Sequence, residues 1–127
     1  MIQTYFAQIK ATVDQYAATN FVLEAKVSFE TRPGEQGYLT GTIIFVDDST
    51  LHFSEYLDQA GDTVEKLMYT YHYQDARNQL IFRYDNARHR PPLPSLEHKH
   101  LPDQVIATPS PTLDDVLAEI ATARGWV

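Results

Sequence analysis

The first residues of the chain follow the polarity pattern of an α-helix. Apolar side chains recur at spacings of three and four residues over about four turns. These positions are Ile2, Tyr5, Phe6, Ile9, Val13 and Tyr16. The pattern predicts an amphipathic helix over residues 2–18 that ends near Asn20.

After this segment the polarity period changes to two, which is typical of half-buried strands. The alternation begins in FVLEAKVSFE and continues in YLTGTIIFVDD, LHFSEYL, TVEKLMYTYHYQD and QLIFRYD. Turn signals such as Pro33-Gly34 and Gly61 separate these segments. The sequence therefore predicts about five strands in a meander, with the tyrosine row Tyr69, Tyr71 and Tyr73 in the core or at its edge.

A second helical pattern closes the chain. Thr112 is followed three residues later by Asp115, the spacing of a capping box, and apolar residues then recur at helical spacing up to Ile120. Two amphipathic helices and half-apolar strands bury their apolar faces most simply in two layers. We therefore expect one α+β domain over residues 1–127, with a five-stranded antiparallel sheet packed against both terminal helices (α-β5-α).

Composition limits the class of protein. The chain is 43% hydrophobic and 21% charged, which is typical of a folded globular protein. It has no cysteine, so disulfides and thiolate metal sites are excluded. No apolar run approaches the roughly 20 residues of a membrane span, and the first residues lack the pattern of a signal peptide. We expect a cytoplasmic protein that makes no contact with membranes.

Basic and titratable residues are concentrated between Arg83 and His100. This stretch holds three of the five histidines and four of the ten Lys and Arg residues, although the formal net charge of the chain is -7. An acidic protein repels nucleic acid at long range, so a polyanion would have to bind to a local patch. Six of the seven prolines follow Arg90, and we therefore expect an exposed proline-rich loop over residues 87–111.

The residue types in this stretch suit RNA cleavage without a metal or other cofactor. Such cleavage needs a base, an acid and fixed cations around the phosphate in the transition state. The catalytic candidates are His89, His98, His100 and Asp85. The candidates for substrate binding are Arg83, Tyr84, Asn86, Arg88, Arg90 and Lys99.

Other interpretations of the same residues remain open. The charges could be solvated, with Asp85 and Asn86 making turn hydrogen bonds at the end of the strand. His98 and His100 could bind a metal weakly together with His89 or Asp85, although the charge of Lys99 opposes a cation there. His52 and His72 lie on predicted strands, where half-exposed sheet positions explain them.

The motifs in this part of the chain resemble those of the TumE toxin family. Tyr84, Asp85, Asn86, Ala87 and His89 match its first motif, and His98, Lys99 and His100 match its second. A closing acidic helix around Asp115 to Ile120 follows in the expected order. The resemblance implies the toxin half of a two-gene toxin-antitoxin module, and its partner would be a cognate, DNA-binding antitoxin.

These observations lead to two hypotheses of different classes. The first is a toxin that acts on RNA as a metal-independent ribonuclease. The second is a non-enzymatic module that binds a partner through an edge of the sheet or through the acidic helix. The two differ in whether the histidines converge on one site.

Overall fold

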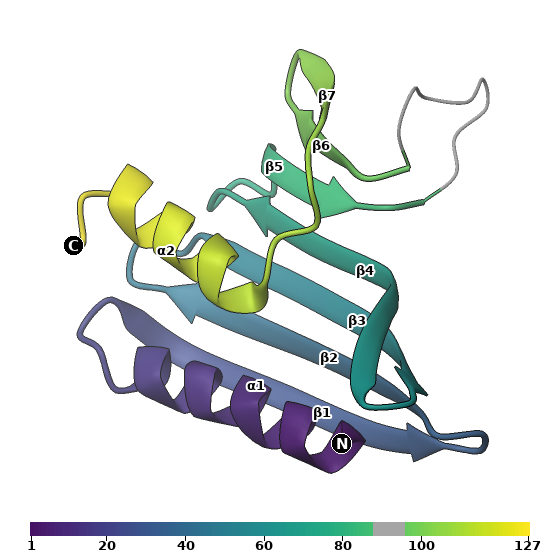
Figure 1. The fold of residues 1–127 in the computed structure, drawn as a ribbon. Coiled ribbons are helices and arrows are strands. Elements are labelled where there is room, and N and C mark those ends of the chain that lie inside the picture. The colour runs from purple at the N-terminus through teal and green to yellow at the C-terminus, as the bar shows by residue number, and fades with distance from the viewer. Residues whose placement is uncertain (88–95) are drawn as a thin grey trace.

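The computed structural model describes residues 1–87 and 96–127, which form two helices and seven strands (Figure 1). The helices are α1 (Ile2–Ala17) and α2 (Leu113–Ala123). The strands are β1 (Val22–Arg32), β2 (Gln36–Phe45), β3 (Thr50–Ala60), β4 (Thr63–Gln74), β5 (Leu80–Asp85), β6 (His98–Leu101) and β7 (Gln104–Ala107). They form one antiparallel sheet in the order β1 to β7. The predicted α+β class is confirmed, whereas the prediction of five strands is wrong.

The two additional strands, β6 and β7, lie within the segment predicted to be a loop, residues 87–111. Pro102 lies in the turn between them, while Pro109 and Pro111 follow β7, so these prolines flank the strands without interrupting them. Each of the two strands has four residues, too few for a clear alternation of polarity. Residues 88–95, the other part of the predicted loop, lie outside the described residues.

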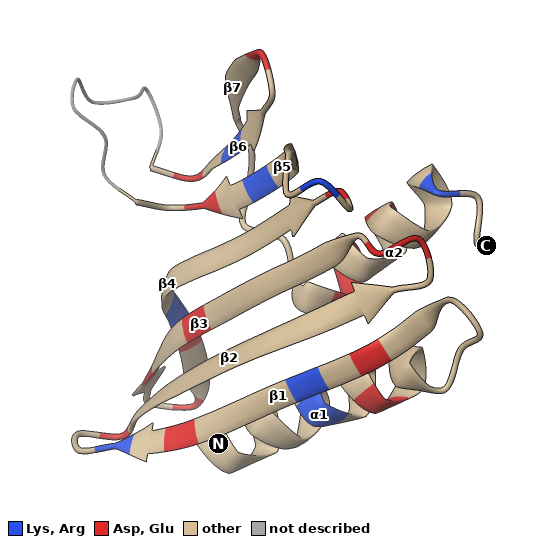
Figure 2. Ribbon diagram, turned by 180° about the vertical axis from the view of Figure 1, so that it is seen from behind, with Lys and Arg blue, Asp and Glu red and all other residues tan. Residues whose placement is uncertain are grey.

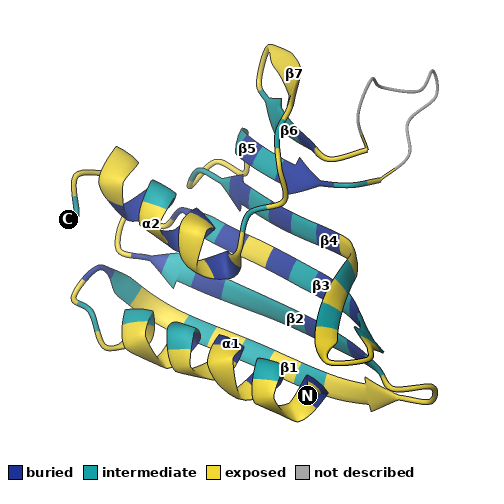
Figure 3. Cartoon of the chain, viewed as in Figure 1, coloured by how far each residue is buried: buried dark blue, intermediate teal, exposed yellow. Residues whose placement is uncertain are grey.

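Both helices pack against the same face of the sheet (Figures 1 and 2). Each helix turns buried positions towards the sheet (Figure 3). They include Phe6 of α1 and Ile120 of α2, which belong to the apolar stripes that predict the helices. Tyr69, Tyr71 and Tyr73 are also buried, which confirms the core interpretation of the tyrosine row. The predicted start of α2 is confirmed as well, because Thr112 and the residue three positions later form a capping box.

A β-bulge in β4 changes which side chains face the helices. Met68 pairs with Tyr56 and Lys66 pairs with Leu57, so Leu67 lies between these paired positions. The additional residue shifts the alternation by one position. Leu67 is consequently exposed, although strict alternation along the strand would place it on the same face as the buried tyrosines. Lys66 faces the core instead and donates a 2.7 Å hydrogen bond to the Tyr71 hydroxyl.

The other face of the sheet, called the open face below, is not covered by either of the helices in the described ranges (Figure 2). Because side chains alternate along a strand, the positions between the buried ones point to this face. On the central strands these positions are mostly polar, for example Thr42, His52, Thr70 and His72. Within the described ranges, neither helix has the length and apolarity needed to cross a bilayer.

Candidate functional site

The site is built on two neighbouring strands at the open face. Asp85 is the last residue of β5, and it pairs with His98 of β6. Arg83, two positions earlier on β5, pairs with His100. Directly paired residues of antiparallel strands project their side chains to the same face, and residues two apart on one strand do so as well. The four side chains therefore converge on the open face, and we call them the Asp85 cluster.

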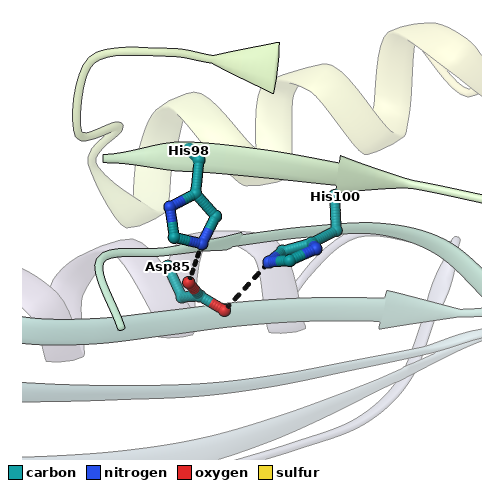
Figure 4. Close-up of side chains that lie close together, drawn as sticks. All are labelled: Asp85, His98 and His100. Atoms are coloured by element: carbon teal, nitrogen blue, oxygen red, sulfur yellow. Dashed lines mark ion pairs between the residues drawn. The ribbon is translucent and has the colours of Figure 1, made fainter. Parts of the chain in front are cut away.

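The carboxylate of Asp85 is at the centre of the cluster (Figure 4). Its Oδ1 lies 2.5 Å from Nε2 of His98, and its Oδ2 lies 3.7 Å from Nε2 of His100. Arg83 donates a hydrogen bond from Nε to Oδ2 over 2.8 Å. The backbone N–H of Ala87 donates to Oδ1 over 3.2 Å, which is the local turn hydrogen bond expected at the strand end. Donors from three directions thus fix the orientation of this carboxylate.

Burial differs between the two histidines. The side chains of Asp85 and His98 are 5% and 2% exposed, whereas that of His100 is 21% exposed. The two imidazole rings meet edge to face, with their centroids 4.7 Å apart. Of the two, His100 therefore presents more of its ring to the surface of the open face.

The charge state of Asp85 follows from its neighbours. Burial alone raises the pKa of a carboxyl group, because it disfavours the charged form. The hydrogen bonds from Arg83 and from the Ala87 N–H, together with the charges of His98 and Arg83, outweigh this effect and lower the pKa of Asp85. Asp85 is consequently ionised at neutral pH and accepts hydrogen bonds only. Because such a carboxylate cannot donate, the Nε2 atom of His98, 2.5 Å away, is placed to be the protonated partner.

Arg83 also connects the cluster to His72 of β4. Its NH1 lies 3.3 Å from Nδ1 of His72, and Nε2 of His72 lies 3.1 Å from Oε1 of Gln74. Burial and the neighbouring Arg83 charge lower the pKa of His72, so its ring is neutral at neutral pH. A neutral ring that accepts from Arg83 at Nδ1 donates to Gln74 at Nε2. The interpretation of His72 as a plain sheet residue missed this connection, since the strand register that creates it is not visible in the sequence.

Two of the predicted substrate-binding residues lie on the opposite face of the sheet. The Tyr84 hydroxyl donates to Glu119 of α2, and Nζ of Lys99 forms a 2.8 Å ion pair with the same carboxylate. Both side chains therefore connect the sheet to α2 and are not part of the Asp85 cluster. Period-two alternation explains the separation, because each of them is adjacent in sequence to residues of the cluster.

The remaining predicted residues have other positions. The Asn86 side chain donates to the Leu67 carbonyl over 2.9 Å and accepts from the Tyr69 N–H over 3.1 Å, so it binds the backbone around the bulge of β4. Three candidates lie outside the described residues: Arg88, His89 and Arg90.

The cluster has a donor set that could hold a metal ion. One ligand atom each from Asp85, His98 and His100 lie within 4.8 Å of one another. Two imidazoles and a carboxylate form a donor set that several transition metals accept. In this structure, however, the guanidinium of Arg83 lies against one oxygen of the same carboxylate, and its positive charge opposes a cation there.

Comparison with known proteins places the chain in a family. The family model described as Toxin TumE matches residues 10–124. The chain belongs to the TumE toxin family. No curated protein and no solved structure matched the chain. The TumE match extends from α1 to α2 and thus includes the strands that carry the Asp85 cluster. It confirms the resemblance inferred from the motifs, and membership of a toxin family implies an antitoxin partner in general.

Proposed function

We propose that this chain is the toxin component of a toxin-antitoxin module and that it cleaves RNA without a metal ion. The observation that carries the proposal is the Asp85 cluster, in which a buried, ionised carboxylate contacts two imidazoles and a guanidinium. Perturbed titratable groups held together on one surface are a frequent property of catalytic sites. The family match supports the toxin assignment.

The reaction would require a proton transfer and the stabilisation of negative charge. In metal-independent RNA cleavage, a base removes the proton of the 2'-hydroxyl, an acid protonates the leaving 5'-oxygen, and cations stabilise the phosphorane-like transition state. We assign proton transfer to His100, since its ring is more exposed than that of His98. The carboxylate of Asp85 lies close enough to stabilise the imidazolium form of His100 during the transfer.

Arg83 is the cation that we assign to the phosphate. A guanidinium has five N–H donors, and the contacts with Asp85 and His72 use two of them. Others can point to the oxygens of a bound phosphate, and the side chain is 39% exposed. His98 and Asp85 act as positioning residues, because their burial keeps them from direct contact with a large substrate.

A second proton-transfer group and further phosphate contacts are assigned from the sequence. His89 remains the candidate for the second group, and Arg88 and Arg90 remain candidates for phosphate binding. Tyr84, Asn86 and Lys99 are given supporting roles, since their contacts lie within the fold. An RNA target and a toxin-antitoxin module would both be consistent with action in the cytoplasm.

A metal-dependent reaction is the second candidate, and the donor set of Asp85, His98 and His100 favours it. The two candidates differ in their response to chelation. Cleavage of RNA by the purified chain should continue in excess EDTA if the reaction depends on proton transfer alone. Loss of cleavage in EDTA, with recovery on addition of one divalent metal, would replace the proposed mechanism with the metal-dependent one.

We also propose that a DNA-binding antitoxin neutralises the chain by covering the segment from Arg83 to His100. Carboxylates of the antitoxin could occupy the positions of RNA phosphates next to Arg83. The edge strand β7 is adjacent to this site, and it exposes Val105 and Ile106. The same edge would serve the non-enzymatic alternative, in which the chain only binds a partner.

Controlled expression tests the proposal. The chain is induced in bacteria with and without the adjacent gene, and both growth and the integrity of total RNA are recorded. We expect growth arrest accompanied by RNA fragmentation, and recovery of both when the adjacent gene is expressed. Growth arrest with intact RNA would favour the non-enzymatic alternative.

A further inference from the structure

A row of polar side chains crosses the open face from β2 to β6. The strand register pairs Thr42 with His52, His52 with His72, His72 with Arg83, and Arg83 with His100. Neighbouring side chains of the row lie close together. The Thr42 hydroxyl lies 3.2 Å from Nδ1 of His52, and the ring centroids of His52 and His72 are 6.5 Å apart. The row therefore leads directly from the middle of the sheet to the Asp85 cluster.

A groove of about 530 Å³ lies over this row on β2 to β5. Its lining includes the hydroxyl side chains of Thr40, Thr42, Ser54 and Thr70. The imidazoles of His52 and His72, the amide of Gln74 and the guanidinium of Arg83 complete its polar surface. None of the described residues that line the groove is acidic. On a chain of net charge -7, a groove without carboxylates suits an anionic ligand better than the rest of the surface does.

Arg83 is shared between the groove and the Asp85 cluster. It lines the groove, and it contacts His72 on one side and Asp85 on the other. If one phosphate of a nucleic-acid chain is bound at Arg83, the neighbouring nucleotides of that chain can lie over His72 and His52. The distance from Thr42 to Arg83 spans three strand spacings, or about 14 Å. Stacked bases are about 3.4 Å apart along a nucleic-acid chain. The row is several times longer than this spacing, so it can contact more than one nucleotide.

We propose that this groove binds the single-stranded RNA segment adjoining the phosphate that is cleaved, an inference that rests on the proposed function. The flat rings of His52 and His72 provide surfaces on which unpaired bases stack. The four hydroxyl groups and Gln74 provide donors and acceptors for base edges and for the 2'-hydroxyl, which distinguishes RNA from DNA. An antitoxin is a less suitable occupant, because the apolar side chains Val105 and Ile106 are exposed at β7 and not in this groove.

Two purified variants test the groove. His52→Ala removes an exposed ring that lies outside the Asp85 cluster, so the fold and the proposed proton transfer should be unaffected. Lys10→Ala is the control, because this exposed lysine of α1 lies on the helix-covered side of the sheet, away from the open face, and its loss also removes a full positive charge. Binding of a fluorescein-labelled single-stranded RNA, and of DNA with the same sequence, is measured by fluorescence anisotropy. Cleavage of the RNA and of a ribodinucleotide, and binding of the purified antitoxin, are measured in parallel.

We expect His52→Ala to raise the Kd for RNA about fivefold or more, as the loss of one stacking contact predicts, while Lys10→Ala has a smaller effect. RNA should bind more tightly than DNA. Cleavage of the ribodinucleotide, which is too short to cover the row, should be equal in all three proteins.

The binding and cleavage measurements separate the two proposals. If His52→Ala binds RNA like the unmodified chain, or if Lys10→Ala weakens binding more, the groove inference is wrong even when cleavage persists. If His52→Ala weakens binding of the antitoxin and not of RNA, the groove is a protein interface and the inference is also wrong. RNA binding that depends on His52 without any cleavage would support the groove and contradict the proposed nuclease reaction.

Discussion

Nε2 of His98 lies 2.5 Å from Oδ1 of Asp85, and both residues are almost completely buried. The sequence predicted an exposed loop at His98, and loss of an exposed side chain usually changes stability by only about 0.5 kcal/mol. Its position on β6 leads to a different expectation. A buried carboxylate that loses a hydrogen-bond donor is left partly unsatisfied, and such a loss costs about 1–3 kcal/mol.

We therefore predict that His98→Ala lowers the free energy of unfolding by about 1–3 kcal/mol. Urea denaturation followed by circular dichroism measures the change through the midpoint of unfolding. Lys10→Ala is the control, since it breaks an exposed ion pair with Asp14 and should change stability by only about 0.5 kcal/mol or less. Equal stability of His98→Ala and the unmodified chain would show that the buried pair contributes nothing.

The lowered pKa of Asp85 predicts a dependence of stability on pH. Because the folded state holds this pKa below its unfolded value of about 3.9, the stabilisation is complete above that value. It is lost as the pH falls through the lower pKa of the folded state. In thermal unfolding from pH 6 downwards, the difference in stability between the unmodified chain and Asp85→Asn should be constant above about pH 5 and shrink below about pH 4. A difference that stays constant in the acid range would contradict the shift.

The sequence predicts the two helices, the first five strands and the motifs, because these depend on local periodicity. It does not predict that His98 is buried or that His72 contacts Arg83, because both depend on which strands pair and in which register. The local sequence pattern does not predict the bulge at Leu67 either. The bulge nevertheless determines that Lys66, and not Leu67, faces the core. The sequence analysis named Asp85 and His100 as candidates, and the structure brings these two side chains together. The face of the sheet to which each neighbouring side chain projects could be determined only from the structure.

The third prediction concerns the assigned proton transfer. His100→Ala should reduce RNA cleavage by about 10²- to 10⁴-fold, as is typical of a lost general acid or base, and should abolish growth inhibition. His89→Ala should have a similar effect, whereas Arg88→Ala should weaken toxicity less, because other cations can partly replace it. Cleavage by purified variants is compared with that of Lys10→Ala after circular dichroism has established that each is folded. Full toxicity of a folded His100→Ala variant would refute the assignment.

The fourth prediction distinguishes the two faces of the sheet. Lys99 pairs with Glu119 of α2 on the helix-covered face, so Lys99→Met should lower stability by roughly 1 kcal/mol and leave cleavage nearly unchanged. Arg83→Met is the matched comparison, because it removes the same charge from the opposite, open face of the sheet. It should reduce cleavage strongly. Cleavage and urea denaturation are measured for both variants, and an equal loss of cleavage would return Lys99 to the substrate-binding residues.

The last prediction concerns the antitoxin. Val105 of the edge strand β7 pairs with His100 of β6, so a partner that covers His100 from the open face must pass over it. Its side chain is apolar and 44% exposed, which suits a protein contact near the site. Val105→Lys would place an ammonium group in that contact, where burial without a partner is costly. We expect the variant to remain toxic and to bind the purified antitoxin at least tenfold more weakly in calorimetry, a loss of about 1.4 kcal/mol.

Leu23→Lys, at an exposed apolar position on the opposite edge strand β1, should bind the antitoxin normally. If both variants bind equally well, the antitoxin docks elsewhere and neutralises the chain without covering this edge.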